Sequence, residues 1–222
     1  MENKRKAVIF DMDGVIVDNH YYHVQAWKTF AKKHNISISD DEITEKFGGI
    51  NREIIPEILG NEYSEGEINE MANEKERIYR EIYDPDIHEI EGLTNLLEQL
   101  KKEGFELAVA TSAPTENSDF VLDRLNIRRF FTLITTAADI THGKPDPEIY
   151  RLTADRLKIS PSDCIVFEDS VRGIQSALSA GMKVIGITTT NPAHIIREAN
   201  LIIDSYSDIT PDKLCELLKK LS

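Results

Sequence analysis

Residues 7–18 have the sequence AVIFDMDGVIVD, in which Asp11 and Asp13 follow a short apolar run and Gly14 follows the second carboxylate directly. The β-branched and aromatic residues before Asp11 predict a buried strand, and Gly14 predicts a sharp turn out of it. Because ligands of open parallel sheets bind beyond the carboxyl ends of the strands, both carboxylates can converge there. Two convergent carboxylates repel each other, so a hard metal ion is expected between them. An isolated D-x-D-G also fits an ordinary acidic loop, so residues downstream must decide.

The composition of the 222-residue chain indicates a soluble globular protein, with 41% hydrophobic and 29% charged residues. A net charge of −13 makes nucleic acids and anionic membranes poor partners. The two cysteines, Cys164 and Cys215, follow no disulfide or metal-binding spacing. No apolar stretch approaches the length of a membrane span, and residues 1–6 lead into the first strand without a signal region. We therefore expect a cytoplasmic protein.

The chain divides into a helical part and a part that alternates between strands and helices. Residues 18–86 show helical spacing without a good strand, and we expect them to form a compact helical insertion. From residue 88 onward apolar strands alternate with amphipathic helices, as in Leu93, Leu96, Leu97 and Leu100. This alternation predicts an α/β fold with a doubly wound parallel sheet and right-handed crossovers. Strands are expected at 7–10, 106–110, 133–135, 164–167, 183–187 and 201–203.

Three further groups of polar residues fall at or near the predicted strand ends. Thr111-Ser112 follow the second strand, Lys144 lies in the loop sequence GKPDP, and Glu168-Asp169-Ser170 follow the fourth strand. Each group has an ordinary explanation, namely a turn hydroxyl, a solvated lysine or a helix cap. Taken one at a time these explanations are favoured, but all of these groups together, in this order, are hard to obtain by chance. They predict an acidic site that holds an anion through hydroxyls and one lysine.

These four motifs resemble those of the haloacid dehalogenase-like hydrolase superfamily. The resemblance spans the whole chain, and the helical insertion resembles the small cap domain of that superfamily. It implies a Rossmann-like catalytic core of residues 1–17 and 87–222 and an all-helical cap of residues 18–86. Within the superfamily the chain is similar to the branch of sugar-phosphate phosphatases and β-phosphoglucomutases. Asp13 argues against the dehalogenases, because that branch lacks an acid at this position.

The resemblance also implies a role for each motif residue. Asp11 would attack phosphorus and form an aspartyl-phosphate, and Asp13 would act as general acid and then as general base. Thr111 and Lys144 would bind the transferring oxygens, where electrostatic catalysis of phosphoryl transfer acts. Ser112 is expected to contact the substrate.

The same resemblance implies magnesium as the cofactor. The ion would be held by the Asp11 carboxylate, the backbone carbonyl of Asp13 and Asp169, with Glu168 in support. It would offset the negative charge and orient the phosphoryl group.

A non-enzymatic alternative comes from signal-receiver domains, which also combine acidic residues, a hydroxyl and a lysine on a parallel sheet. Those domains are shorter and lack a helical insertion after the first strand. The insertion at residues 18–86 therefore favours an enzyme, because a cap excludes water and selects a substrate.

The choice between phosphatase and phosphomutase depends on the cap. His23 and Arg52 resemble the mutase pattern, and both are candidate substrate-binding residues, with His23 within reach of Asp13. The sequence Thr-Ser-Ala-Pro-Thr-Glu-Asn from Thr111 lacks the Ser-Lys-Asn character of mutases, and no cap lysine is identified among Lys75, Arg77 and Arg80. We therefore expect a monomeric phosphatase of a small phosphorylated metabolite, with β-phosphoglucomutase as the alternative. For His23, packing inside the cap is an equal possibility.

Overall fold

The computed structural model describes residues 5–46, 49–59 and 63–219. Within these residues six strands form one sheet in the order β3-β2-β1-β4-β5-β6, and every neighbouring pair is parallel. The doubly wound α/β fold predicted from the sequence is therefore confirmed. The strands are β1 (Ala7–Phe10), β2 (Glu106–Ala110), β3 (Leu133–Thr135), β4 (Cys164–Glu168), β5 (Lys183–Ile187) and β6 (Leu201–Ile203). Because the strand order reverses at β1, the carboxyl ends of β1, β2 and β4 lie side by side at the switch point, where such sheets bind ligands.

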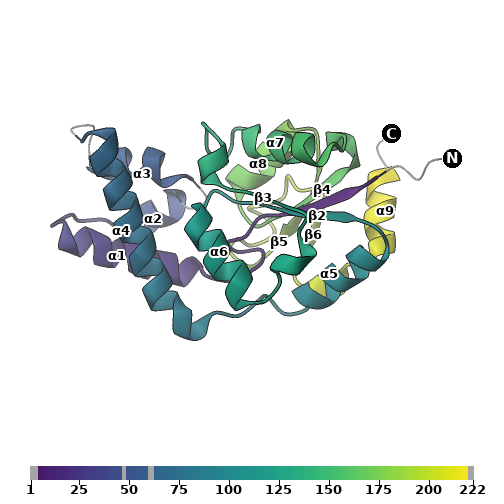
Figure 1. Cartoon of the computed structure of the whole chain (residues 1–222), viewed down its shortest axis with the longest axis horizontal. Helices are drawn as coiled ribbons and strands as arrows, with labels where there is room; N and C mark the ends of the chain where they lie inside the picture. The colour runs from purple at the N-terminus through teal and green to yellow at the C-terminus, as the bar shows by residue number, and fades with distance from the viewer. Residues whose placement is uncertain (1–4, 47–48, 60–62, 220–222) are drawn as a thin grey trace.

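Helices cover both faces of this sheet (Figure 1). Alternate strand residues point to opposite faces, so Val8 and Phe10 of β1 enter one buried cluster while Ala7 and Ile9 enter the other. The first cluster also holds apolar residues of α5, α6 and α9, and the second holds those of α7 and α8. The bounds are α5 (Leu93–Lys102), α6 (Thr115–Arg124), α7 (Glu148–Leu157), α8 (Val171–Ser179) and α9 (Pro211–Lys219). A sheet packed on both faces holds the strand ends rigidly.

The cap helices lie together at one end of the sheet, next to α6, rather than over its two faces (Figure 1). They are α1 (His20–Lys33), α2 (Asp40–Lys46), α3 (Asn51–Leu59) and α4 (Glu65–Tyr83). The longest, α4, begins with a capping box in which the Ser64 side chain accepts from the Glu67 backbone and Glu67 accepts from Ser64. The predicted helical cap is thus present. Its division from the core at residues 18 and 87 stays a prediction.

The helices that the structure describes contain no apolar stretch long enough to cross a bilayer.

Candidate active site

The first carboxylate of the site extends the central strand. Asp11 directly follows β1, and its backbone N–H donates to the carbonyl of Phe167 in β4 at 3.0 Å. The side chain is 10% exposed. Because the sheet holds its backbone on the β4 side, Asp11 has one fixed position at the carboxyl end of β1.

Lys144 places a positive charge against this carboxylate. Its Nζ atom lies 3.0 Å from Asp11 Oδ1 and 2.6 Å from Glu168 Oε1, in fully buried surroundings. Burial by itself would lower the pKa of Lys144, but the carboxylates of Asp11 and Glu168 outweigh it and raise the pKa above its ordinary value. The guanidinium of Arg172 donates to the Lys144 carbonyl at 2.5 and 2.9 Å, which fixes the loop that carries the lysine.

Glu168 is held by donors on both of its oxygens. Oε1 accepts from Lys144 and from the Tyr150 hydroxyl, the latter at 2.6 Å, and Oε2 accepts from the Ser170 hydroxyl at 3.1 Å. The Ser170 hydroxyl also accepts from the Gly173 backbone at 3.0 Å, so Ser170 caps α8 as predicted. Glu168 is therefore oriented by its neighbours.

Asp169 differs from Glu168, because neither of its buried carboxylate oxygens has a hydrogen-bond partner among the residues that the structure describes. Among the described residues, ligand atoms of Asp11, Glu168 and Asp169 lie within 4.8 Å of one another. Burial, reinforced by Glu168, raises the pKa of Asp11 to about 7 and that of Asp169 well above its ordinary value. Unpaired carboxylate oxygens in a buried acidic cluster fit a hard divalent cation, which takes oxygen ligands and would favour their ionised forms.

The backbone conformation and close surroundings of residue 14 explain why the acidic motif ends in glycine. Its φ of +75° lies in the left-handed region, and a Cβ atom at this position would collide with the carboxylate of Asp169. The turn after Asp13 therefore passes directly over the acidic cluster.

Thr111 and Ser112 follow β2 at the same edge of the sheet. The Thr111 side chain is buried, and its hydroxyl accepts from the Ala113 backbone at 3.1 Å. The buried Ser112 hydroxyl has no hydrogen-bond partner in the described part of the chain and lines the space between core and cap. Both hydroxyls follow the strand beside β1, as the motif analysis expected of an anion site.

Asp13 points away from the acidic cluster and toward the cap. Its Oδ1 accepts from the Asn19 amide at 2.6 Å, and its Oδ2 lies 3.6 Å from His23 Nε2. Asn19 also donates to the Tyr79 hydroxyl at 2.6 Å, and the His23 ring stacks on Tyr79 with a centroid separation of 3.9 Å. The structure thus places His23 next to Asp13 and also packs it inside the cap, so it combines both sequence alternatives.

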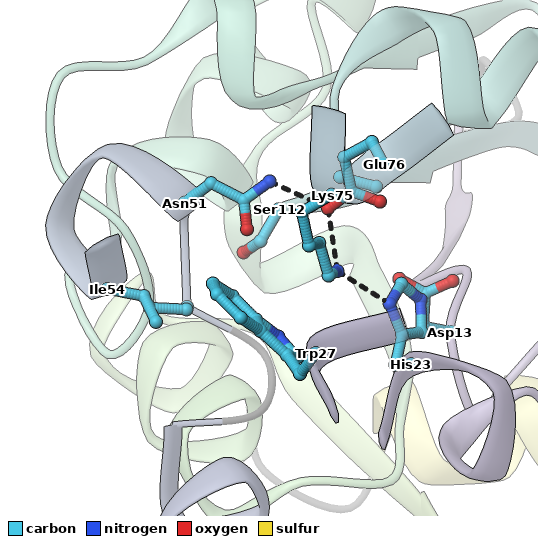
Figure 2. A pocket seen from close by; sticks show the side chains of 10 residues that line it. Asp13, His23, Trp27, Asn51, Ile54, Lys75, Glu76 and Ser112 are labelled. Atoms are coloured by element: carbon cyan, nitrogen blue, oxygen red, sulfur yellow. Dashed lines mark hydrogen bonds and ion pairs between the residues drawn. The ribbon is translucent and has the colours of Figure 1, made fainter. Parts of the chain in front are cut away.

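Lys75 completes the cap side of the site (Figure 2). Its Nζ atom lies 2.9 Å from His23 Nδ1, 2.8 Å from Glu76 Oε1 and 5.1 Å from the centre of the Trp27 ring. Because an ammonium group only donates, Nδ1 of His23 accepts and Nε2 carries the hydrogen toward Asp13. These residues line a cavity of about 40 Å³ with Asp13 and Ser112.

Arg52 lies at a second, larger cavity of about 220 Å³ between core and cap. Its guanidinium donates to the carbonyls of Ile140 and Thr141 in the core, at 2.5 and 2.8 Å. The structure therefore brings Arg52 to the space between core and cap, but there it joins the two parts of the chain. Ser112 and Glu76 line both cavities.

Sequence reasoning missed several residues of this site: Asn19, Lys75, Glu76, Tyr79, Asn117 and Tyr150. A signal was present for Lys75, because it falls within the apolar stripe of α4 formed by residues such as Met71, Ile78 and Tyr79. A lysine on the buried face of an amphipathic helix indicates a paired charge. Asn19 and Tyr150 gave no comparable signal, since a polar residue near a turn and an aromatic residue in a helix are common.

Comparison with known proteins identifies the family to which this site and fold belong. A family model described as haloacid dehalogenase-like hydrolase matches residues 8–187, which run from the second residue of β1 to the end of β5 and include all four motifs. The chain belongs to this family. It is 36% identical over 219 residues to a β-phosphoglucomutase of Bacillus subtilis, covering 95% of this chain and 94% of the relative. It is also 30% identical over 222 residues to a phosphorylated carbohydrates phosphatase of Thermotoga maritima, covering 97% and 99%.

A solved structure of the family supports the same fold. The crystal structure of β-phosphoglucomutase from Clostridium difficile superimposes with a TM-score of 0.88 at 30% sequence identity, covering 97% of both chains. Relatives of this haloacid dehalogenase-like protein thus include a mutase and a phosphatase at comparable similarity.

Proposed function

We propose that this protein is a phosphatase that hydrolyses a small phosphorylated metabolite, such as a sugar phosphate, through an aspartyl-phosphate on Asp11. The observation that carries the proposal is the buried cluster in which Lys144 Nζ lies 3.0 Å from Asp11 Oδ1 while Asp13 faces the cap. A nucleophile inside the core and an acid beside the substrate space are the two groups that this chemistry needs. Relatives that include a phosphatase support the assignment.

Two steps follow from this arrangement. An Asp11 oxygen forms a bond to phosphorus while the bond from phosphorus to the leaving oxygen breaks, and Asp13 transfers its proton to that leaving oxygen. Asp13 then takes a proton from water, and the hydroxide attacks phosphorus while the bond to Asp11 breaks. Inorganic phosphate leaves, and both aspartates return to their starting forms. Thr111, Ser112 and Lys144 would hold the oxygens of the transferring group.

Asp11, Asp169 and the Asp13 carbonyl would hold Mg²⁺, with Glu168 in support. When bound, this ion offsets negative charge on the phosphoryl group and on the cluster. We expect chelator to abolish phosphatase activity, magnesium to restore it and calcium to substitute poorly. Full activity in excess chelator would contradict this part of the proposal.

A β-phosphoglucomutase activity is the second candidate, because of the 36% identity to the Bacillus subtilis enzyme and the position of Lys75 beside His23. A mutase must also bind a second phosphate on its bisphosphate intermediate. We place the phosphatase first because the cap cations that line the two cavities among the described residues already have partners, Lys75 with Glu76 and Arg52 with two core carbonyls.

The test supplies β-glucose 1-phosphate, magnesium and a catalytic amount of glucose 1,6-bisphosphate. We expect release of inorganic phosphate from several sugar phosphates without isomerisation. Rapid formation of glucose 6-phosphate with little free phosphate would establish the mutase instead.

A further inference from the structure

The cap contains a buried carboxylate that the proposed chemistry does not use. Glu76 is 4% exposed, and it accepts hydrogen bonds from three side chains. Oε1 accepts from Lys75 at 2.8 Å and from the Asn51 amide at 2.6 Å, whereas Oε2 accepts from the Asn117 amide at 2.7 Å. Asn117 lies in the first turn of α6 in the core, so Glu76 connects the cap to the core.

The side-chain amide of Asn117 binds two residues of α4. Its Nδ2 donates to Glu76, and its Oδ1 accepts from Arg80 Nη1 at 2.6 Å. Glu76 and Arg80 are four residues apart and so lie on one face of the helix. Both ends of a fully buried amide are thereby used, which fixes Glu76 at the boundary of the two cavities.

Glu76 is ionised under physiological conditions. Burial by itself would raise its pKa, but the Lys75 ammonium, His23 and the hydrogen bonds from Asn51 and Lys75 lower it to about 2. Apart from Asp13, the charged side chains among the described residues that line the two cavities are Arg52, Lys75, Glu76 and Glu116. These four side chains together, two positive and two negative, carry no net charge.

We infer that Glu76 is a specificity-determining residue, because it cancels the charge of Lys75 and so favours an uncharged, hydroxyl-bearing leaving group over one that carries a second phosphate. The inference rests on the proposed phosphatase function and names the substrate class more closely. Hydroxyl groups both donate and accept, so they can pair with Lys75, Glu76 and the Ser112 hydroxyl, which has no partner among the described residues. A second phosphate would have to approach a fixed carboxylate in a partly desolvated space, where like charges repel strongly.

The test changes the charge of Glu76 while it keeps the size of the side chain. Glu76→Gln, compared with wild type, is assayed for kcat/KM with glucose 6-phosphate and with glucose 1,6-bisphosphate. We expect wild type to prefer the monophosphate and Glu76→Gln to reduce this preference about tenfold, mainly through KM for the bisphosphate. Glu81→Gln on the same helix is the matched control, since Glu81 is exposed and pairs with Arg77 on the surface of α4. The control should keep the wild-type preference.

A second pair of variants separates charge from geometry. Lys75→Gln should increase the preference for the monophosphate, whereas the neutral double variant Lys75→Gln with Glu76→Gln should return it to near the wild-type value. The double variant also keeps the test decisive if one single variant does not fold. A preference that does not follow the net charge of the pair, or a wild-type preference for the bisphosphate, would overturn the inference.

A binding measurement distinguishes failure of this inference from failure of the proposed function. Trp27 is the only tryptophan of the chain and lines the smaller cavity, so its fluorescence reports binding of either ligand to an Asp11→Asn background without turnover. Absence of phosphate release by the wild type would contradict the phosphatase. Glu76→Gln added to this background should change the ratio of the dissociation constants for the monophosphate and the bisphosphate. An unchanged ratio would contradict the role of Glu76 and leave the proposed phosphatase function standing.

Discussion

Lys144 in the core and Lys75 in the cap are both buried and both paired with glutamate, but their surroundings differ. Lys144 contacts Asp11 and Glu168, two carboxylates fixed at the ends of adjacent strands. Lys75 contacts Glu76 and His23, which belong to two cap helices. The core lysine is therefore held by the sheet at the acidic cluster, whereas the position of the cap lysine depends on how the cap packs. We interpret the first as part of the reaction chemistry and the second as part of substrate selection.

The largest effect is expected for the nucleophile in the core. Asp11→Asn removes the negative charge that attacks phosphorus, so kcat should fall by about a thousandfold or more. The fold should remain intact, because the amide has nearly the same size. Steady-state phosphate release measures the loss, and Asp155→Asn on the exposed surface of α7 is the control. Ordinary turnover by Asp11→Asn would rule out the covalent route.

The two lysines themselves give the next prediction. Lys144→Met should lower kcat about a hundredfold, because it removes a fixed charge from the transferring oxygens. Lys75→Met should mainly raise KM, by about tenfold, because it acts on the bound substrate in both ground state and transition state. Initial rates over a range of substrate concentrations separate the two parameters. Equal losses of kcat in both variants would remove the proposed distinction between core and cap.

The sequence predicted the core lysine and not the cap lysine for a physical reason. Asp11 and Thr111 directly follow strands and Glu168 is the last residue of β4, and parallel strands bring their carboxyl ends together whatever the rest of the chain does. The pairing of Lys75 with His23 requires α1 and α4 to pack in one particular rotation. Helical spacing places His23 and Trp27 on one face of α1, but it does not show which residue of another helix they meet.

Stability should depend on pH through the cap pair. The pKa of Glu76 is lowered to about 2 in the folded protein, so the pair contributes stability above the ordinary value of 4.5 and loses it as the pH falls toward 2. The shift corresponds to roughly 3 kcal/mol at neutral pH, and about 1 kcal/mol of it should be lost by about pH 3.5.

Urea unfolding of wild type and Glu76→Gln at several pH values measures this contribution. The difference in unfolding free energy between the two proteins should be constant near neutral pH and should shrink in acid. A difference that grows as the pH falls would show that Glu76 is not stabilised in its ionised form.

The smallest of these effects is expected for Arg52. Arg52→Ala removes the hydrogen bonds to the carbonyls of Ile140 and Thr141, so the cap should dock less firmly. We expect KM to rise about fivefold with kcat nearly unchanged. Arg77→Ala, which removes an exposed arginine of α4, should leave both parameters unchanged. A loss confined to kcat would instead place Arg52 in the reaction step.

The central claim is that the phosphoryl group passes through Asp11, and chemical trapping tests it most directly. An aspartyl-phosphate is reduced by borohydride to homoserine, which mass spectrometry identifies by position. Enzyme mixed with a sugar phosphate and magnesium, then quenched into borohydride during turnover, should contain homoserine at residue 11 and none when substrate is omitted. Steady phosphate release with unmodified Asp11, or homoserine at another aspartate, would contradict the account.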